Sequence, residues 1–111
     1  MEAINGLTLW DVHEDDQVVI YVRGELDFAT TPHLIKTIRN IKDENVDKYV
    51  IDCEEVTFID SETLKYVLGL RKDFAQCGRR LWFRKCSPQV KRILDLLGLS
   101  DQLIISEPAE A

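Results

Sequence analysis

The first quarter of the chain alternates apolar and polar residues, a pattern typical of β-strands with one buried face. Leu7 and Leu9 alternate with their neighbours in a run that extends to about His13, and a second run spans Val18–Arg23. Only the polar residues 14–17 separate the two runs. A connection this short predicts that the two strands form an antiparallel hairpin.

Two further runs predict strands later in the chain. Lys48–Cys53 is short, rich in β-forming residues and almost continuously apolar, as in a strand that is buried on both faces. Arg80–Arg84 places Leu81 and Phe83 on one face. Segments with helical periodicity lie between these runs, so the chain is expected to alternate helices with strands after the hairpin.

Three segments repeat apolar residues at helical spacing, and each begins with a start signal. The first opens at Thr31, a cap, followed by Pro32 at the first helical position. The second opens at Asp60 or Ser61, either of which has a side-chain oxygen that can cap the first turn. The third repeats the cap-then-proline signal at residues 87–88. The predicted buried stripes are Leu34, Ile35, Ile38 and Ile41; Leu64, Val67, Leu70, Phe74 and Cys77; and Val90, Ile93, Leu94 and Leu97.

The predicted helices end at Asp43–Asn45, at Gly78 and at Gly98, where the following Leu99 is typical of a left-handed glycine stop. Residues 103–105 predict a short strand or helix edge, and residues 106–111 a frayed tail. This order predicts a single α/β domain over residues 1–111. Its mixed β-sheet starts with an N-terminal antiparallel hairpin, followed by alternating helices and strands.

Composition and charge narrow the function classes. The hydrophobic content is 45%, and no apolar run approaches the length of about 18 residues that a bilayer requires. With no basic-then-apolar leader at the N-terminus, a soluble cytoplasmic protein is expected. The net charge of −6 argues against nonspecific nucleic-acid binding. Residues 71–92 nevertheless hold eight basic residues and one acid, which indicates solvated faces or, alternatively, a docking surface for an acidic partner.

No pattern of a known catalytic or cofactor site is present. Cys53, Cys77 and Cys86 lack metal-binding spacing, so they are interpreted as buried thiols in a reducing compartment, with no metal or cofactor expected. The chain has no phosphate-binding glycine loop, and Ser61 is not flanked by the glycines of a nucleophile elbow. Nothing in the spacing brings a histidine to Ser61, so an enzyme is not expected.

The Ser61 turn is the candidate functional site. At a helix start, unpaired N–H groups and the helix dipole favour negative charge, so such a place can receive a phosphate. The alternative is that the serine is only a cap. Both Asp27 and the Asp60-Ser61 turn directly follow predicted strands, and functional loops gather beyond the carboxyl ends of such strands. We therefore expect them to be neighbours.

Three stretches together resemble the STAS domain, specifically the stand-alone anti-sigma factor antagonists of bacteria. They are Gly24–Asp27 with Thr30, Phe58–Ser61, and Ser87–Asp95 continuing through residues 98–99. The similarity covers nearly the whole chain in order. Each stretch alone is a weak signal, whereas the combination is fairly specific for the family.

The resemblance implies a partner-switching protein. Unphosphorylated, such a protein binds an anti-sigma factor that is also a serine kinase, and thereby frees a sigma factor. The kinase phosphorylates the serine that matches Ser61, and a phosphatase reverses the reaction. Asp27 and Asp60 match the acidic positions beside that serine, with roles in local structure or recognition. An alternative is a scaffold module that assembles with its relatives without cycling a phosphate.

The sequence departs from the family pattern directly after Ser61. Glu62 and Thr63 stand where the family commonly has serine or threonine followed by glycine. Thr63 is expected to restrict the approach of a partner backbone, and Glu62 adds a fixed negative charge.

Ser61, Lys65, Leu68 and Lys72 share one helix face, with Leu68 as an exposed apolar contact. That face is either a docking face or an ordinary solvated one. The candidate partner-binding residues are Asp27, Asp60, Glu62, Thr63, Lys65, Leu68 and Lys72, with Ser61 as the candidate phosphorylation site.

Overall fold

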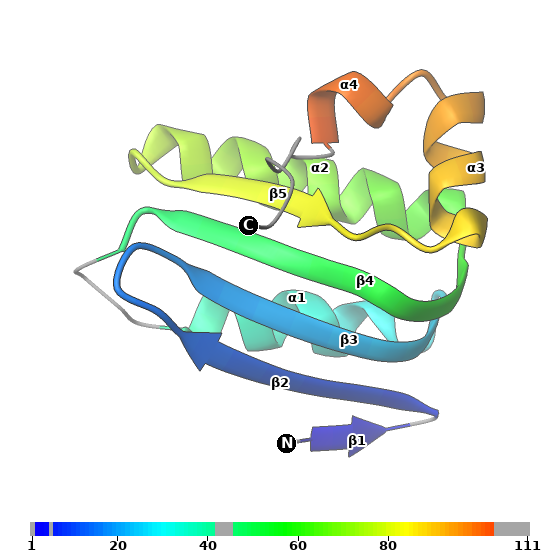
Figure 1. Cartoon of the computed structure of the whole chain (residues 1–111), viewed down its shortest axis with the longest axis horizontal. Coiled ribbons are helices and arrows are strands. Elements are labelled where there is room, and N and C mark those ends of the chain that lie inside the picture. Colours follow the sequence, from blue (N-terminus) through cyan, green and yellow to red (C-terminus); the bar gives the residue numbers. More distant parts are fainter. Residues whose placement is uncertain (1, 5, 42–45, 104–111) are drawn as a thin grey trace, which may run out of the picture.

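A five-stranded mixed sheet forms the centre of the protein in a computed structural model that describes residues 2–4, 6–41 and 46–103 (Figure 1). The strands follow the order β1-β2-β3-β4-β5 across the sheet. They are β1 (Glu2–Ile4), β2 (Leu7–His13), β3 (Val18–Leu26), β4 (Lys48–Ile59) and β5 (Arg80–Arg84).

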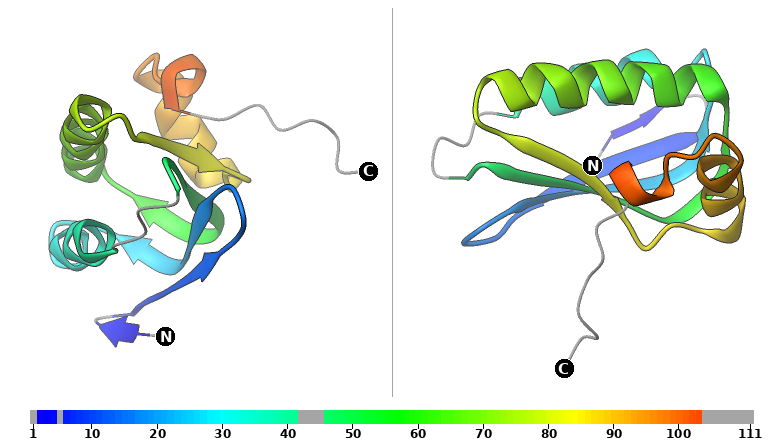
Figure 2. Two further views of the ribbon diagram at one scale, coloured as in Figure 1. Left: turned by 90° about the vertical axis from the view of Figure 1, so that its left-hand side faces the viewer. Right: turned by 90° about the horizontal axis from the view of Figure 1, so that it is seen from above.

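The pairing of the strands confirms the predicted fold class. β2 and β3 form the antiparallel hairpin, and β1 extends it on the outer side of β2. β3, β4 and β5 run parallel, so their carboxyl ends meet at one edge of the sheet. Helices α1 (Thr31–Asn40) and α2 (Ser61–Gln76) connect these parallel strands and cover one face (Figure 2, left).

Helix α3 (Pro88–Leu96) packs against β4, and the short α4 (Ser100–Leu103) lies near β5. Ser87 caps α3 by accepting a hydrogen bond from the Val90 N–H at 3.4 Å, as the cap-then-proline signal predicts. Gly98 has φ +70°, and the N–H of Leu99 donates to the carbonyl of Leu94 at 2.8 Å, which confirms the glycine stop.

The core lies between the sheet and the helices, and the predicted stripes supply most of what the helices contribute to it. Cys77 and Leu97 differ from the prediction, because both are exposed. Each stands where its helix ends and a glycine turns the chain away, Gly78 with φ +74° in one case and Gly98 in the other. Leu99, beyond that second turn, packs against the core instead.

The strands extend further than the apolar runs indicate. β3 continues to Leu26 and β4 to Ile59, and these two residues pair with each other. The polar residues in this extension face solvent, where Arg23 and Glu55 form an ion pair at 3.1 Å. The sequence did not predict β1, because a run of three residues carries too little periodicity to identify a strand.

The register of β3 with β4 has two irregularities, one between Tyr21 and Arg23 and one between Gly24 and Glu25. Gly24 has φ +113°, and a Cβ atom at this position would lie 2.0 Å from the carbonyl oxygen of Gly6. Gly6, just before β2, therefore packs directly on the backbone of β3.

Some predictions need correction at the helix ends. The cap of α1 is Thr30 rather than Thr31, which is already helical. Helix α1 ends at Asn40, and the predicted stop at residues 43–45 lies outside the described residues. Leu103 ends α4, whereas residues 104–111, including the predicted tail, are also outside the described part. In the part that is described, no helix is long and apolar enough to cross a membrane.

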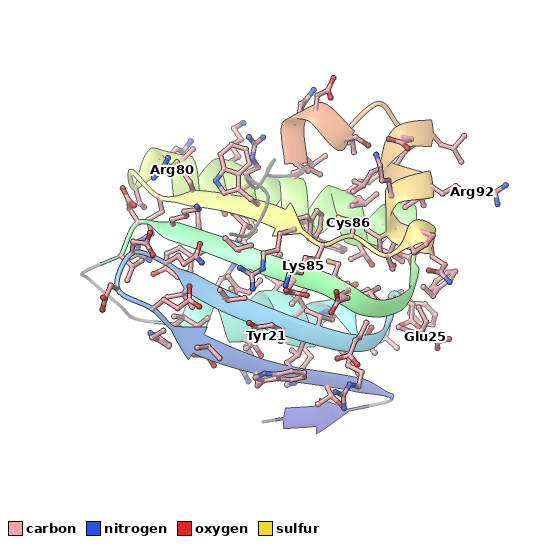
Figure 3. The ribbon with its side chains drawn as sticks, viewed as in Figure 1. Tyr21, Glu25, Arg80, Lys85, Cys86 and Arg92 are labelled. Carbon is pink, nitrogen blue, oxygen red and sulfur yellow. The ribbon has the colours of Figure 1, made fainter. Side chains whose placement is uncertain are left out.

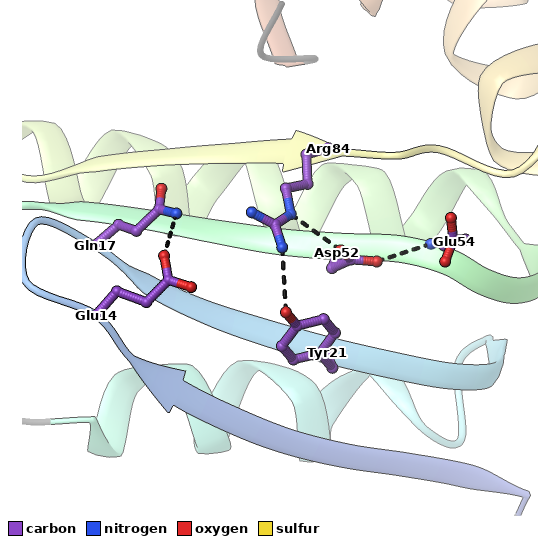
Figure 4. Close-up of polar contacts among 6 residues, drawn as sticks. All are labelled: Glu14, Gln17, Tyr21, Asp52, Glu54 and Arg84. Atoms are coloured by element: carbon purple, nitrogen blue, oxygen red, sulfur yellow. Dashed lines mark hydrogen bonds and ion pairs between the residues drawn. The ribbon is translucent and has the colours of Figure 1, made fainter. Parts of the chain in front are cut away.

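The face of the sheet away from α1 and α2 contains a buried ion pair (Figure 4). The Nε of Arg84 on β5 lies 3.0 Å from the carboxylate of Asp52 on β4, and both side chains are less than a tenth exposed. Arg84 also donates to the hydroxyl of Tyr21 at 3.2 Å. Charged residues in a buried position are tolerated because they are paired in this way.

Candidate functional site

The Ser61 corner is the region where β3 and β4 end side by side, and comprises residues 25–31 and 58–63. Leu26 pairs with Ile59, and the N–H of Asp60 donates to the Leu26 carbonyl at 3.2 Å. The predicted proximity of the Asp27 loop to the Asp60-Ser61 turn at the carboxyl edge is therefore confirmed. Figure 3 shows Glu25 at this end of β3.

Asp60 is the cap of α2. Its Oδ1 atom accepts hydrogen bonds from the N–H of Thr63 at 2.8 Å and from the Thr63 hydroxyl at 2.7 Å. Ser61 is thus the first helical residue rather than the cap. Its side chain is exposed, and no hydrogen bond ties its hydroxyl to the part of the chain that the structure describes. Ser61 therefore presents a hydroxyl to solvent at a helix N-terminus.

Thr63 differs from the expectation, because its side chain is completely buried. Its hydroxyl lies 2.6 Å from the Thr31 hydroxyl and 3.2 Å from the Leu26 carbonyl oxygen. A buried side chain of this kind cannot restrict a partner backbone, so that expectation is wrong. The helical periodicity of the sequence already indicated that Thr63 is buried, because Thr63 precedes Val67 by one turn on the stripe that also includes Leu70.

Asp27 orders the loop between β3 and α1. Its Oδ1 atom accepts hydrogen bonds from the N–H groups of Ala29 at 2.9 Å and Thr30 at 3.1 Å. The Thr30 hydroxyl in turn donates to the Glu25 carbonyl at 2.8 Å. The carboxylate of Asp27 is therefore engaged with its own loop, which is the local structural role that the resemblance left open.

The ordered loop presents an apolar side chain that the sequence analysis did not single out. Phe28 is 81% exposed, and Phe58, beside Glu25 in the register of β3 and β4, is 46% exposed. Neither residue belongs to a helical stripe, so periodicity gives no reason to select it. Exposed aromatic side chains that share an edge of a sheet are typical of protein-binding surfaces.

The predicted face along α2 divides into two parts. Glu62 and Lys65 are exposed beside Ser61 and form an ion pair at 3.1 Å. Leu68 is half-buried against the core, so it is less exposed than expected, and with the exposed Lys72 it lines a hollow beside β5. Ser61 and Lys72 are eleven residues apart, which corresponds to about 16 Å along the helix.

The two histidines line a common hollow. His13 lies 2.6 Å from the Asp11 carboxylate, and both histidines line a surface hollow of about 440 Å³ that does not include Ser61. Within the described residues, no cluster of three or more histidine, cysteine or acidic side chains is arranged to hold a metal ion.

Shifted pKa values occur away from the Ser61 corner. A hydrogen bond from Cys53 lowers the pKa of the half-buried Cys86, and burial raises the pKa of Cys53. A hydrogen bond from Ser100 lowers the pKa of the Asp95 carboxyl. The buried position of Cys53 agrees with the prediction, whereas Cys86 is only partly buried and Cys77 is exposed.

The Ser61 corner thus combines an exposed hydroxyl with two exposed aromatic rings at one end of a small mixed α/β fold. The family model of the STAS domain matches residues 10–111. The chain therefore belongs to the STAS domain family.

Several known proteins are similar over nearly the whole chain. An anti-sigma-B factor antagonist of Staphylococcus epidermidis is 27% identical over 105 residues, which cover 95% of this chain and 97% of the relative. The crystal structure of an anti-sigma factor antagonist from Mycobacterium paratuberculosis superimposes with a TM-score of 0.80 at 23% identity, covering 98% and 92% of the two chains.

A third relative has been solved in two states. The anti-sigma factor antagonist SpoIIAA in its unphosphorylated form gives a TM-score of 0.73 at 22% identity, covering 90% of this chain and 89% of SpoIIAA. The phosphorylated form of the Bacillus protein gives 0.66 at 22% identity, covering 90% and 92%. At this identity, both structures support the fold of the chain.

Proposed function

We propose that this protein is an anti-sigma factor antagonist controlled by phosphorylation of Ser61. In the unphosphorylated state it binds a cytoplasmic anti-sigma factor with serine kinase activity, and a sigma factor is released. Phosphorylation of Ser61 by that kinase ends the interaction, and a phosphatase restores it. The protein acts by binding rather than by catalysis. The observation that carries the proposal is the exposed Ser61 hydroxyl on an ordered corner with exposed aromatic side chains.

The proteins that are similar to this chain also support the proposed function. Proteins named anti-sigma-B factor antagonist match the chain over nearly all of its length, and a structural neighbour, SpoIIAA, has been solved with and without phosphate. The Ser61 corner of this chain has what such a switch requires, namely an accessible acceptor next to apolar contact area. Of the candidate partner contacts, Glu62 and Lys65 flank the hydroxyl on the exposed side of α2.

A phosphate on Ser61 should act mainly on the complex rather than on the fold. It adds about −1.5 to −2 charges at neutral pH. The N-terminus of α2 stabilises that charge by about 0.3–1 kcal/mol, whereas Glu62 opposes it by repulsion. These local effects partly offset each other. In a complex the dianion would be desolvated against a surface that fits a neutral hydroxyl, and that cost weakens binding.

The decisive experiment combines phosphate mapping with partner binding. The chain is incubated with its cognate kinase and ATP, and any phosphate is located by mass spectrometry. Affinity for the anti-sigma factor is then measured for Ser61→Ala and Ser61→Asp. We expect Ser61→Ala to bind and Ser61→Asp to lose about tenfold or more in affinity, which corresponds to about 1.4 kcal/mol.

Gln89→Asp is the matched control, because Gln89 is an exposed residue in the first turn of α3. It adds the same charge at the start of a different helix, outside the residues that make up the Ser61 corner, and binding should persist. Full affinity in Ser61→Asp together with no phosphate on Ser61 would refute the switch. Large assemblies on size-exclusion chromatography would then favour a scaffold module.

A further inference from the structure

Four of the eight basic residues between 71 and 92 gather around one hollow. This α2–β5 groove has a volume of about 270 Å³ and lies between the second half of α2 and the start of β5. Figure 3 shows Arg80 at the start of β5, along the edge of the sheet opposite β1. The groove is lined by Leu68, Arg71, Lys72, Ala75, Arg79, Arg80, Leu81 and Trp82.

One side of the groove is a free strand edge. β5 is the last strand in the sheet order and pairs only with β4 among the described residues. A strand that is paired on one side directs alternate N–H and C=O groups outward, where an extended chain can add to the sheet. The apolar surface beside this edge comes from Leu68 and Trp82, which are both half-buried, and Leu81.

The other side of the groove is cationic. The Arg71 guanidinium lies 5.3 Å from the centre of the Trp82 ring, and Arg79 lies 5.7 Å from the Tyr49 ring. Within the described residues, neither arginine forms an ion pair with a carboxylate, and Lys72 also forms none. Arg80 lies 3.6 Å from Asp47, an exposed pair that contributes little.

The rest of the surface contrasts with this groove. The one acid in the basic stretch, Asp73, is bound by Arg39 of α1 at 2.8 Å and does not neutralise the groove. Several exposed cations elsewhere have acidic partners, such as Lys65 with Glu62 and Arg23 with Glu55. A chain with a net charge of −6 thus concentrates four cations around one apolar hollow. Such a surface attracts a segment of opposite charge with apolar side chains.

We propose that the α2–β5 groove docks an extended, acidic segment of a partner protein, which adds to the edge of β5. Alternate carboxylates of the segment face Arg71, Lys72, Arg79 and Arg80, and its apolar side chains enter the hollow beside Trp82. The indole Nε1–H of Trp82 is shielded from solvent and has no acceptor among the described residues. This surface is additional to the proposed switch at Ser61.

The test uses the full chain carrying Trp10→Phe, so that Trp82 is the only tryptophan and reports on the groove. The probe is a blocked peptide of about ten residues that alternates glutamate with leucine and valine, long enough to form one strand. The same peptide with lysine in place of glutamate, and a single-stranded DNA of similar length, serve as comparisons. We expect the acidic peptide alone to change the Trp82 emission, with an affinity that falls as salt rises. Amide exchange in Arg80–Arg84 should slow.

Two double variants with the same change in net charge distinguish binding at the groove from a general attraction between the acidic peptide and the cations of the protein. Arg71→Glu with Lys72→Glu should lower peptide affinity by about tenfold or more. Lys36→Glu with Arg92→Glu changes exposed cations on α1 and α3 and should retain it. No peptide binding, equal binding of the DNA, or equal losses in both variants would overturn the proposal. Because the assay contains no anti-sigma factor or kinase, its failure would leave the Ser61 switch unaffected.

Discussion

Thr63→Val tests whether the buried hydroxyl network holds the Ser61 corner in place. Valine keeps the β-branched shape of threonine and removes only the hydroxyl. In the variant, the Leu26 carbonyl keeps the N–H of Asp60 at 3.2 Å, and the Asp60 carboxylate keeps the N–H of residue 63 at 2.8 Å. The buried hydroxyl of Thr31, however, loses its one partner among the described residues.

The expected cost follows from these contacts. A lost hydrogen bond contributes about 0.5–1.5 kcal/mol, and a buried hydroxyl left without a partner costs about 1–3 kcal/mol. We therefore expect Thr63→Val to reduce the free energy of unfolding by about 2–4 kcal/mol. Urea denaturation followed by circular dichroism measures this as a lower midpoint with an unchanged slope. Affinity for the anti-sigma factor should fall as well, because the start of α2 is less firmly held.

A double-mutant cycle provides the sharper test. Adding Thr31→Val removes the unpaired hydroxyl, so the double variant should be more stable than the sum of the single effects by about 1–2 kcal/mol. Thr37→Val, at a half-buried position of α1, is the control and should stay within about 0.5 kcal/mol. The reasoning is refuted if the losses in unfolding free energy of the two single variants simply add in the double variant. It is also refuted if Thr63→Val loses no more unfolding free energy than the control Thr37→Val.

Three further outcomes are expected. Phe28→Ser should lower affinity for the anti-sigma factor by about tenfold or more, because the ring is 81% exposed and free to contact a partner. The free energy of unfolding should change by less than about 0.5 kcal/mol. Calorimetric titration measures the affinity and urea denaturation the stability, and a loss of stability with unchanged affinity would contradict the prediction. Arg84→Met leaves the Asp52 carboxylate buried without its cation and should cost about 3–5 kcal/mol in urea denaturation; a wild-type midpoint would show that the pair is dispensable. The alkylation rate of Cys86 should rise with pH around a midpoint below 9.0, the ordinary pKa of a cysteine thiol, because the hydrogen bond from Cys53 favours the Cys86 thiolate. Cys53, whose pKa is raised by burial, should react only after unfolding. Mass spectrometry of the labelled peptides measures both reactions, and a Cys86 midpoint above 9.0 would contradict the first prediction.

The order of elements was predictable because its signals are local. Cap residues, prolines and glycines mark the helix boundaries at Asp60, Ser87 and Gly98, and short-range periodicity identifies the buried stripes. The exact cap of α1 was not predictable, since Thr30 and Thr31 offer the same side chain at adjacent positions. β1 was missed because its stability depends on pairing with β2 rather than on its own three residues.

The Ser61 corner was predictable only in part. Ser61 and Asp60 were found because a helix start follows a strand there. Phe28 was not found, because its exposure depends on how the Asp27 carboxylate folds the loop, and no periodic pattern reports that. The position of Lys72 in a separate hollow was likewise not predictable, since the hollow forms only when α2 packs beside β5.

The close approach at Gly24 gives a physical reason for the glycine that opens the stretch Gly24–Asp27. Any other residue would place a carbon atom against the Gly6 carbonyl oxygen and would strain a backbone with φ +113°. Relief would require either the first turn of the chain to move or β3 to straighten, and straightening would shift Leu26 relative to Ile59. If codon 24 were randomised and folded chains were selected, glycine alone should be recovered.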